Sequence, residues 1–100
     1  MAHRHIFFDK TEIVLAIVGS NNVTNVNVRY NQITSIRIER VPVRKMLFLK
    51  GADDVIIIKQ NGADEPYKFF RRKEKQYFDE YVRDMTEFAT KNKLTFTNTL

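Results

Sequence analysis

The last third of the chain holds the only long segment with the periodicity of an amphipathic α-helix. Apolar residues recur there at steps of three and four, which places them on one helical face. This face comprises Phe78, Tyr81, Val82, Met85, Phe88 and Ala89. We expect the helix to begin near Lys73 and to end at residues 91–93, where Asn92 tolerates a left-handed conformation. An isolated helix of this length is marginal in water, so it must cover a sheet.

The chain before this helix alternates short β-like segments with turn residues. Strict alternation is clearest where Val26, Val28 and Tyr30 point one way and the residues between them point the other. The step of three from Ile33 to Ile36 breaks period two, which indicates a bulge or a strand start. In all we predict seven strands, at residues 3–8, 13–18, 25–30, 33–39, 45–50, 55–59 and 67–71.

Turn signals separate these segments. Residues 19–22 (Gly-Ser-Asn-Asn) and 51–54 (Gly-Ala-Asp-Asp) are turns on composition, and Asn61-Gly62 is the strongest hairpin signal. Pro42 either closes the fourth strand or lies at a sheet edge, because proline cannot donate to a β ladder. We therefore expect a mainly β domain with one C-terminal helix.

The residues that characterise this order of elements are Tyr30, Ile33, Ile36, Ile38, Gly51, Ile56, Ile58, Phe69 or Phe70, Phe78, Tyr81, Phe88 and the tail 92–96. In these residues and in the order of its elements, the chain resembles the pleckstrin-homology-like fold of small bacterial proteins. It implies a barrel of about seven antiparallel strands capped by the amphipathic helix, and a recognition or assembly role. Lipid-binding members carry a basic pattern in the first hairpin, where this chain has Asp-Lys-Thr-Glu at residues 9–12. If residues 3–8 are not a strand, the alternative is an open sheet with the helix across one face.

Length and composition indicate a single domain over residues 1–100. The sequence contains no cysteine, so it offers no disulfide, thiolate metal site or cysteine nucleophile. Its longest apolar run, residues 13–19, is far shorter than the roughly 20 residues that a transmembrane helix needs. No secretory signal pattern is evident. We expect a cytoplasmic protein.

Few residues suggest catalysis. His3 and His5 would share one face of a strand and, with Asp9, offer a candidate metal site, although no third-ligand motif accompanies them. The paired acids at residues 53–54 and 64–65 fall in predicted turns, so we expect them to be solvated. The glycines are isolated and form no phosphate-binding loop. We therefore predict neither an enzyme nor a metal or cofactor site.

Basic residues form two clusters that are candidates for anion binding. The chain's net charge of +5 resides in residues 1–50, and residues 51–100 are neutral overall. The clusters comprise Arg37, Arg40, Arg44 and Lys45, and Arg71, Arg72, Lys73 and Lys75. If they converge in space they form a site; if not, they are solvated edges that discourage strand-to-strand aggregation.

These observations favour a non-catalytic module that binds a protein partner or itself, for example by adding a strand to an exposed edge. The alternative is electrostatic binding of an anionic ligand, either membrane lipid or nucleic acid, through the basic clusters. The sequence does not identify the partner.

Overall fold

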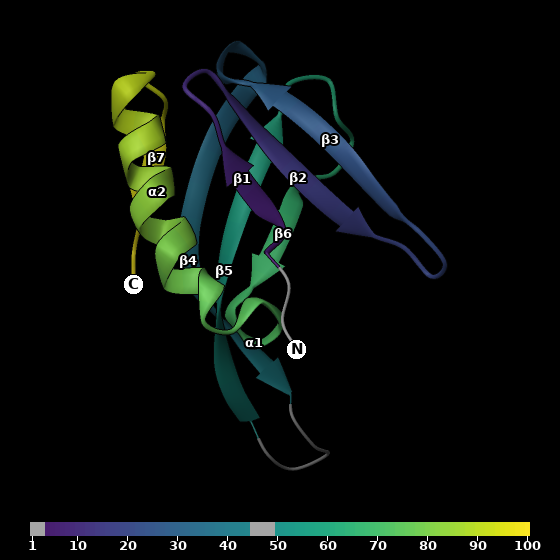
Figure 1. The fold of residues 1–100 in the computed structure, drawn as a ribbon. Helices are drawn as coiled ribbons and strands as arrows, with labels where there is room; N and C mark the ends of the chain where they lie inside the picture. The colour runs from purple at the N-terminus through teal and green to yellow at the C-terminus, as the bar shows by residue number, and fades with distance from the viewer. Residues whose placement is uncertain (1–3, 45–49) are drawn as a thin grey trace.

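The computed structural model describes the backbone of residues 4–44 and 50–100, and the side chains of residues 4–42 and 51–100. Seven strands form two sheets, and helices follow the sixth strand (Figure 1). The elements are β1 (Ile6–Phe8), β2 (Glu12–Val18), β3 (Val23–Arg29), η1 (Tyr30–Gln32), β4 (Ile33–Arg44), β5 (Lys50–Gln60), β6 (Tyr67–Phe70), α1 (Arg71–Glu74), α2 (Tyr77–Lys91) and β7 (Phe96–Asn98).

The first sheet is an antiparallel meander in the order β1-β2-β3. Its central strand β2 is apolar on both faces, as the sequence predicted for residues 13–18. The predicted alternation in β3 is confirmed, because Val28 is buried while Asn25 and Asn27 are exposed. Tyr30, by contrast, lies in the 3-10 turn after the strand. The predicted first strand is shorter than expected and begins at Ile6.

The second sheet has the order β6-β5-β4-β7. Strands β4 and β5 form a long antiparallel hairpin, with the predicted irregularity located between Ile33 and Ser35. Pro42 does not close β4 but pairs with Ala52, beyond the part of β4 that contacts β7. Strand β7 comes from the tail after the helix and pairs in parallel with β4 at Ile36–Ile38. The expectation of a purely antiparallel arrangement is therefore wrong.

Two sequence predictions need correction here. The structure shows two sheets and no closed barrel among the described residues. The predicted turn at residues 51–54 is instead part of β5, which runs unbroken from Lys50 to Gln60. The predicted strand at 45–50 lies outside the described residues except for Lys50. Because β5 includes residues 51–54, Asp53 and Asp54 are strand residues.

The helical segment is divided in two. Lys75 adopts a positive φ of 53° and separates α1 from α2. Helix α2 ends at Lys91, as predicted, but the left-handed residue is Lys93 and not Asn92. The N–H groups of Lys93 and Leu94 donate to the carbonyls of Thr90 and Ala89, respectively, which is the Schellman pattern.

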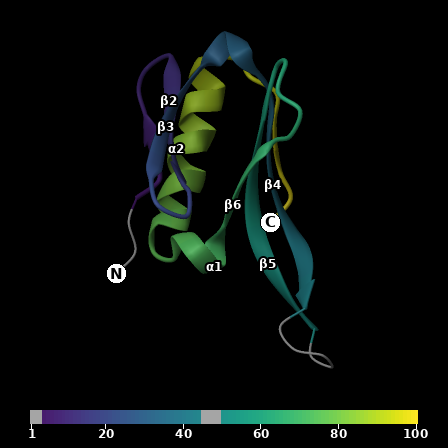
Figure 2. The same ribbon diagram turned by 90° about the vertical axis from the view of Figure 1, so that its right-hand side faces the viewer.

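One apolar core joins both sheets to α2. Figure 2 shows the three-stranded and four-stranded sheets on either side of the helix, which fills the open side between them. Both sheets and the helix contribute buried side chains to this core. They are Ile6, Ile13, Leu15 and Val28 from the three-stranded sheet; Ile33, Ile36, Ile38, Ile56, Ile58 and Phe69 from the four-stranded sheet; and Phe78, Tyr81, Met85, Phe88 and Ala89 from α2. Among the described residues, no helix is long and apolar enough to span a membrane.

Candidate functional site

Two arginines, one from each predicted basic cluster, meet at a buried carboxylate. Arg40 Nε on β4 donates to Asp54 Oδ1 at 2.8 Å, and Arg71 Nε on α1 donates to Asp54 Oδ2 at 2.7 Å. Asp54 lies opposite Arg40 on β5, and only 5% of its surface is exposed. The two clusters therefore touch through an acid that already binds both guanidinium groups.

The remaining members of the clusters are dispersed. Arg37 lies on the opposite face of β4 from Arg40, because neighbouring side chains of a strand alternate, and it pairs with Glu39 at 2.7 Å. Lys45 and the side chain of Arg44 lie outside the described part of the chain. The other three, Arg72, Lys73 and Lys75, are exposed around α1. In the described structure the predicted residues thus converge only at Asp54.

The adjacent aspartates of β5 are buried, which contradicts the prediction of a solvated turn. Asp53 Oδ1 accepts hydrogen bonds from the backbone N–H groups of Asp54 and Arg72, at 2.9 and 3.3 Å, and so ties α1 to β5. Asp53 Oδ2 has no hydrogen-bond partner within residues 4–44 and 50–100. The hydrogen bond from Arg40, opposed by burial and aided by Arg71, lowers the pKa of Asp54. This carboxylate is therefore ionised at neutral pH and stabilises the sheet-to-helix junction.

A third buried acid, Glu74, connects the N-terminal segment to the helices. Its Oε1 lies 2.9 Å from His5 Nδ1 and accepts a 3.0 Å hydrogen bond from the Tyr81 hydroxyl. The same hydroxyl accepts a 2.7 Å hydrogen bond from the backbone N–H of His5. Burial raises the pKa of Tyr81 to about 12, so its phenol keeps its proton at neutral pH. These contacts join His5, Glu74 and Tyr81 to one another, so they form a structural cross-link between the N-terminal segment and the helices.

The described residues do not form the candidate metal site that the sequence suggested around His3 and His5. His5 contacts Glu74 and not Asp9, the acid that the sequence analysis associated with it. His3 lies outside the described residues. Across the described ranges, no group of three or more His, Cys, Asp or Glu side chains is positioned to hold a metal ion. Asp64 and Glu65 are exposed, as predicted.

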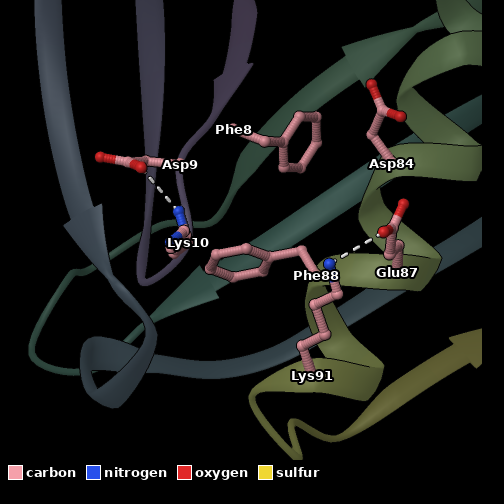
Figure 3. Close-up of a pocket in the computed structure, with 7 residues that line it drawn as sticks. All are labelled: Phe8, Asp9, Lys10, Asp84, Glu87, Phe88 and Lys91. Carbon is pink, nitrogen blue, oxygen red and sulfur yellow. Dashed lines mark hydrogen bonds and ion pairs between the residues drawn. The ribbon is translucent and has the colours of Figure 1, made fainter.

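A surface hollow lies between the β1–β2 turn and the C-terminal half of α2 (Figure 3). It has a volume of about 400 Å³ and is lined by Phe8, Asp9, Lys10, Asp84, Glu87, Phe88 and Lys91. The rings of Phe8 and Phe88 are tilted against each other with centroids 6.0 Å apart. Glu87 pairs with Lys91 and Asp84 pairs with Arg4. Two of the three lining acids are thus paired with cations of the same chain, and Phe8 and Phe88 form the apolar part of the hollow.

The β2–β3 hairpin is the most exposed apolar feature. In Figure 1 it extends away from α2 and ends in the turn at residues 19–22. Val18 and Val23 lie opposite each other at its tip, with 60% and 61% of their surfaces exposed. Phe7 on β1 is also exposed on the same face of the sheet, opposite Val14.

Strand β3 is an edge of its sheet. Its backbone N–H and C=O groups point alternately toward β2 and away from it, and the register shows which residues point which way. Tyr30 N–H donates to the Thr11 carbonyl and Gly19 N–H donates to the Asn22 carbonyl, so even-numbered β3 residues face β2. The odd-numbered residues direct their backbone groups outward. At Arg29 the outward N–H donates to the Gln32 side chain at 3.0 Å. Among residues 4–44 and 50–100, no strand pairs with the outward backbone groups of Val23, Asn25 and Asn27.

One signal in the sequence could have revealed a buried acid. Asp54 precedes Ile56 and Ile58 at steps of two, which places it on the core-facing side of a strand. Glu74 offers no such signal, because Lys75 interrupts the helix between it and Phe78. The open β3 edge follows from strand order, which the sequence alone does not give. Comparison of the chain with protein-family models, with curated proteins and with solved structures finds no match.

Proposed function

We propose that this chain is a non-catalytic binding module that acts through protein–protein contact or self-association. The observation that carries the proposal is the open edge of β3, flanked at the hairpin tip by exposed Val18 and Val23. Unpaired strand edges recruit further strands, with main-chain hydrogen bonds supplying affinity and side-chain pairing supplying specificity.

Comparison of the four sheet edges supports the choice of β3. Strands β1 and β7 are only three residues long, and the four residues of β6 include Lys68. Short length and lysine are the usual protection against edge-to-edge pairing. Strand β3 has seven residues and carries no proline and no charge before Arg29. Strand β3 is thus the least protected of these four edge strands. The part of β4 beyond β7, which also lacks a strand on that side among the described residues, carries Arg40 and Pro42.

Electrostatic binding of membrane lipid or nucleic acid is less well supported. The two arginines that converge, Arg40 and Arg71, are paired with Asp54, and Arg71 also pairs with Asp79 at 2.8 Å. An anion would have to displace these acids. The exposed cations of α1 remain available for a weak, salt-sensitive contact.

We also propose a distant relationship to the pleckstrin-homology-like fold and a location in the cytoplasm. A three-stranded and a four-stranded sheet joined by a C-terminal helix support the first proposal. The open arrangement of the sheets and the parallel strand β7 depart from the expected barrel. Such a relationship favours recognition over catalysis, although a fold alone does not determine function.

The test combines light scattering of purified protein at low and physiological salt with the ratio of absorbance at 260 and 280 nm. A defined oligomer with a protein spectrum, or capture of a protein partner that is lost in a Val18→Thr/Val23→Thr variant, supports the proposal. A monomer that captures no protein contradicts it. Bound nucleic acid that salt removes supports the electrostatic alternative, and flotation with anionic vesicles at low salt tests its lipid branch.

A further inference from the structure

We propose that the partner of the β3 edge is β3 of a second copy of this chain, paired antiparallel across a two-fold axis at Asn25. This inference rests on the proposed binding function and specifies its partner and its geometry. The product is a continuous six-stranded sheet in the order β1-β2-β3-β3-β2-β1. A two-fold interface of this kind uses the same residues on both copies.

The register follows from the open backbone groups. Three consecutive outward positions are available, at Val23, Asn25 and Asn27, because Gln32 already binds the N–H of Arg29. An antiparallel pair uses all three on both copies only when Asn25 faces Asn25 of the second copy. Val23 then faces Asn27 of the second copy. A register centred on Asn27 would place Arg29, with its N–H already bonded, opposite Asn25.

The charge distribution favours a second copy at this edge. The chain has a net charge of +5, so two copies repel each other over most approaches. The sixteen residues from Ile13 to Val28, which form nearly all of the β2–β3 hairpin, contain no charged side chain. This is the longest uncharged run in the sequence. Two hairpins therefore meet without opposing like charges, and Arg29 lies beyond the paired segment.

The side chains of the proposed pair are also compatible. On the sheet face that carries Val28, Thr24 of one copy lies opposite Val26 of the other, and β-branched pairs of this type stabilise antiparallel ladders. On the other face the two Asn25 side chains meet at the axis, where their amides can donate to and accept from each other. Asn25 is exposed in the single chain, so a change there disturbs no internal contact of the core.

The experiment uses opposite charges at the axis. Asn25→Lys and Asn25→Glu each place two like charges face to face, and a mixture of the two variants pairs unlike charges. We expect wild type at high concentration to show twice the monomer mass of 11.9 kDa in light scattering. We expect each variant alone to be monomeric and the equimolar mixture to regain the dimer mass. Asn61→Lys and Asn61→Glu, in the exposed β5–β6 loop, introduce the same charges away from the edge and serve as controls.

The outcomes separate this inference from the general function. If wild type dimerises and the Asn25 variants remain dimers, the β3 pairing is wrong while self-association through another surface stands. If wild type stays monomeric but captures a different protein, the second-copy inference is wrong and the binding function stands. If it is a monomer without any protein partner, both fail. Circular dichroism of each Asn25 variant verifies that it is folded, and restoration by mixing verifies the same point independently.

Discussion

The backbone N–H of His5 and the hydroxyl of Tyr81, 76 positions apart in the sequence, form a 2.7 Å hydrogen bond that fixes the N-terminal segment to α2. Because the same hydroxyl donates to Glu74, one buried phenol serves two partners from different elements. The cross-link attaches β1 to the helix, and therefore holds the three-stranded sheet whose far edge is β3.

Removing this hydroxyl should weaken the fold. We expect Tyr81→Phe to lower the free energy of unfolding by about 1–3 kcal/mol, because the buried Glu74 loses a donor and the His5 N–H loses its acceptor. Urea denaturation of wild type and variant measures the difference. Tyr77→Phe is the matched control, since Tyr77 stacks on Tyr81 and is only partly buried. Equal losses in both variants would show that the hydroxyl network is not the cause.

Alkaline titration should reveal Tyr81 as a late tyrosinate step. Its pKa is raised from 10.0 to about 12 by burial, so the folded state favours the protonated phenol. The resulting stabilisation is fully present below the unfolded pKa and is lost as pH rises from about 10 to about 12. We expect one tyrosinate absorbance step to occur late, and to be missing in Tyr81→Phe. A late step that persists in the variant would contradict the assignment.

Asp54 should contribute to the acid sensitivity of the protein. Its pKa is lowered in the folded state, chiefly by Arg40, so its stabilisation is present above the ordinary carboxyl pKa and is lost as pH falls through the folded value. We expect Asp54→Asn to destabilise the protein at neutral pH by about 1.5–3 kcal/mol, the range for hydrogen bonds to charged groups. The difference from wild type should shrink on acidification. Asp64→Asn, at an exposed loop position, should have little effect at either pH.

The end of α2 offers a stabilising substitution. Lys93 adopts a left-handed conformation with φ of 55°, which glycine accepts without steric conflict. A left-handed conformation costs a non-glycine residue about 1–2 kcal/mol, and glycine costs about 0.5–1 kcal/mol in entropy. We therefore expect Lys93→Gly to raise the free energy of unfolding by roughly 0.5–1 kcal/mol, measured by urea denaturation. Arg83→Gly, at an exposed position inside α2, should instead lower it by about 1 kcal/mol. A loss of stability in Lys93→Gly would mean that the side chain makes a contribution greater than the backbone strain.

Local sequence patterns predicted the β2–β3 hairpin and α2 because both are encoded within one segment. The turn at residues 19–22 and the alternation through Val26 and Val28 are visible without knowledge of the fold. They do not show that β3 becomes an edge, since that depends on which strands pair elsewhere. The candidate interaction surface was therefore predictable as a strand and not as an open edge.

The misassigned turn at residues 51–54 has a different cause. Acidic residues are rare inside strands, and Asp54 is tolerated there because Arg40 and Arg71, 14 and 17 positions away, neutralise it. No local pattern contains that information. Strand β7 was not predicted for a related reason. Its three residues form a strand only because the tail after α2 lies beside β4 and pairs with it, which no local pattern shows.

The most direct test of the account is amide hydrogen exchange in β3 at low and high protein concentration. The N–H groups of Val26 and Val28 bond to β2 in a single chain, so they provide an internal reference. We predict that the N–H groups of Asn25 and Asn27 exchange rapidly in dilute protein and become protected at high concentration. Rapid exchange of both at every concentration, with Val26 and Val28 protected throughout, would contradict pairing at the β3 edge.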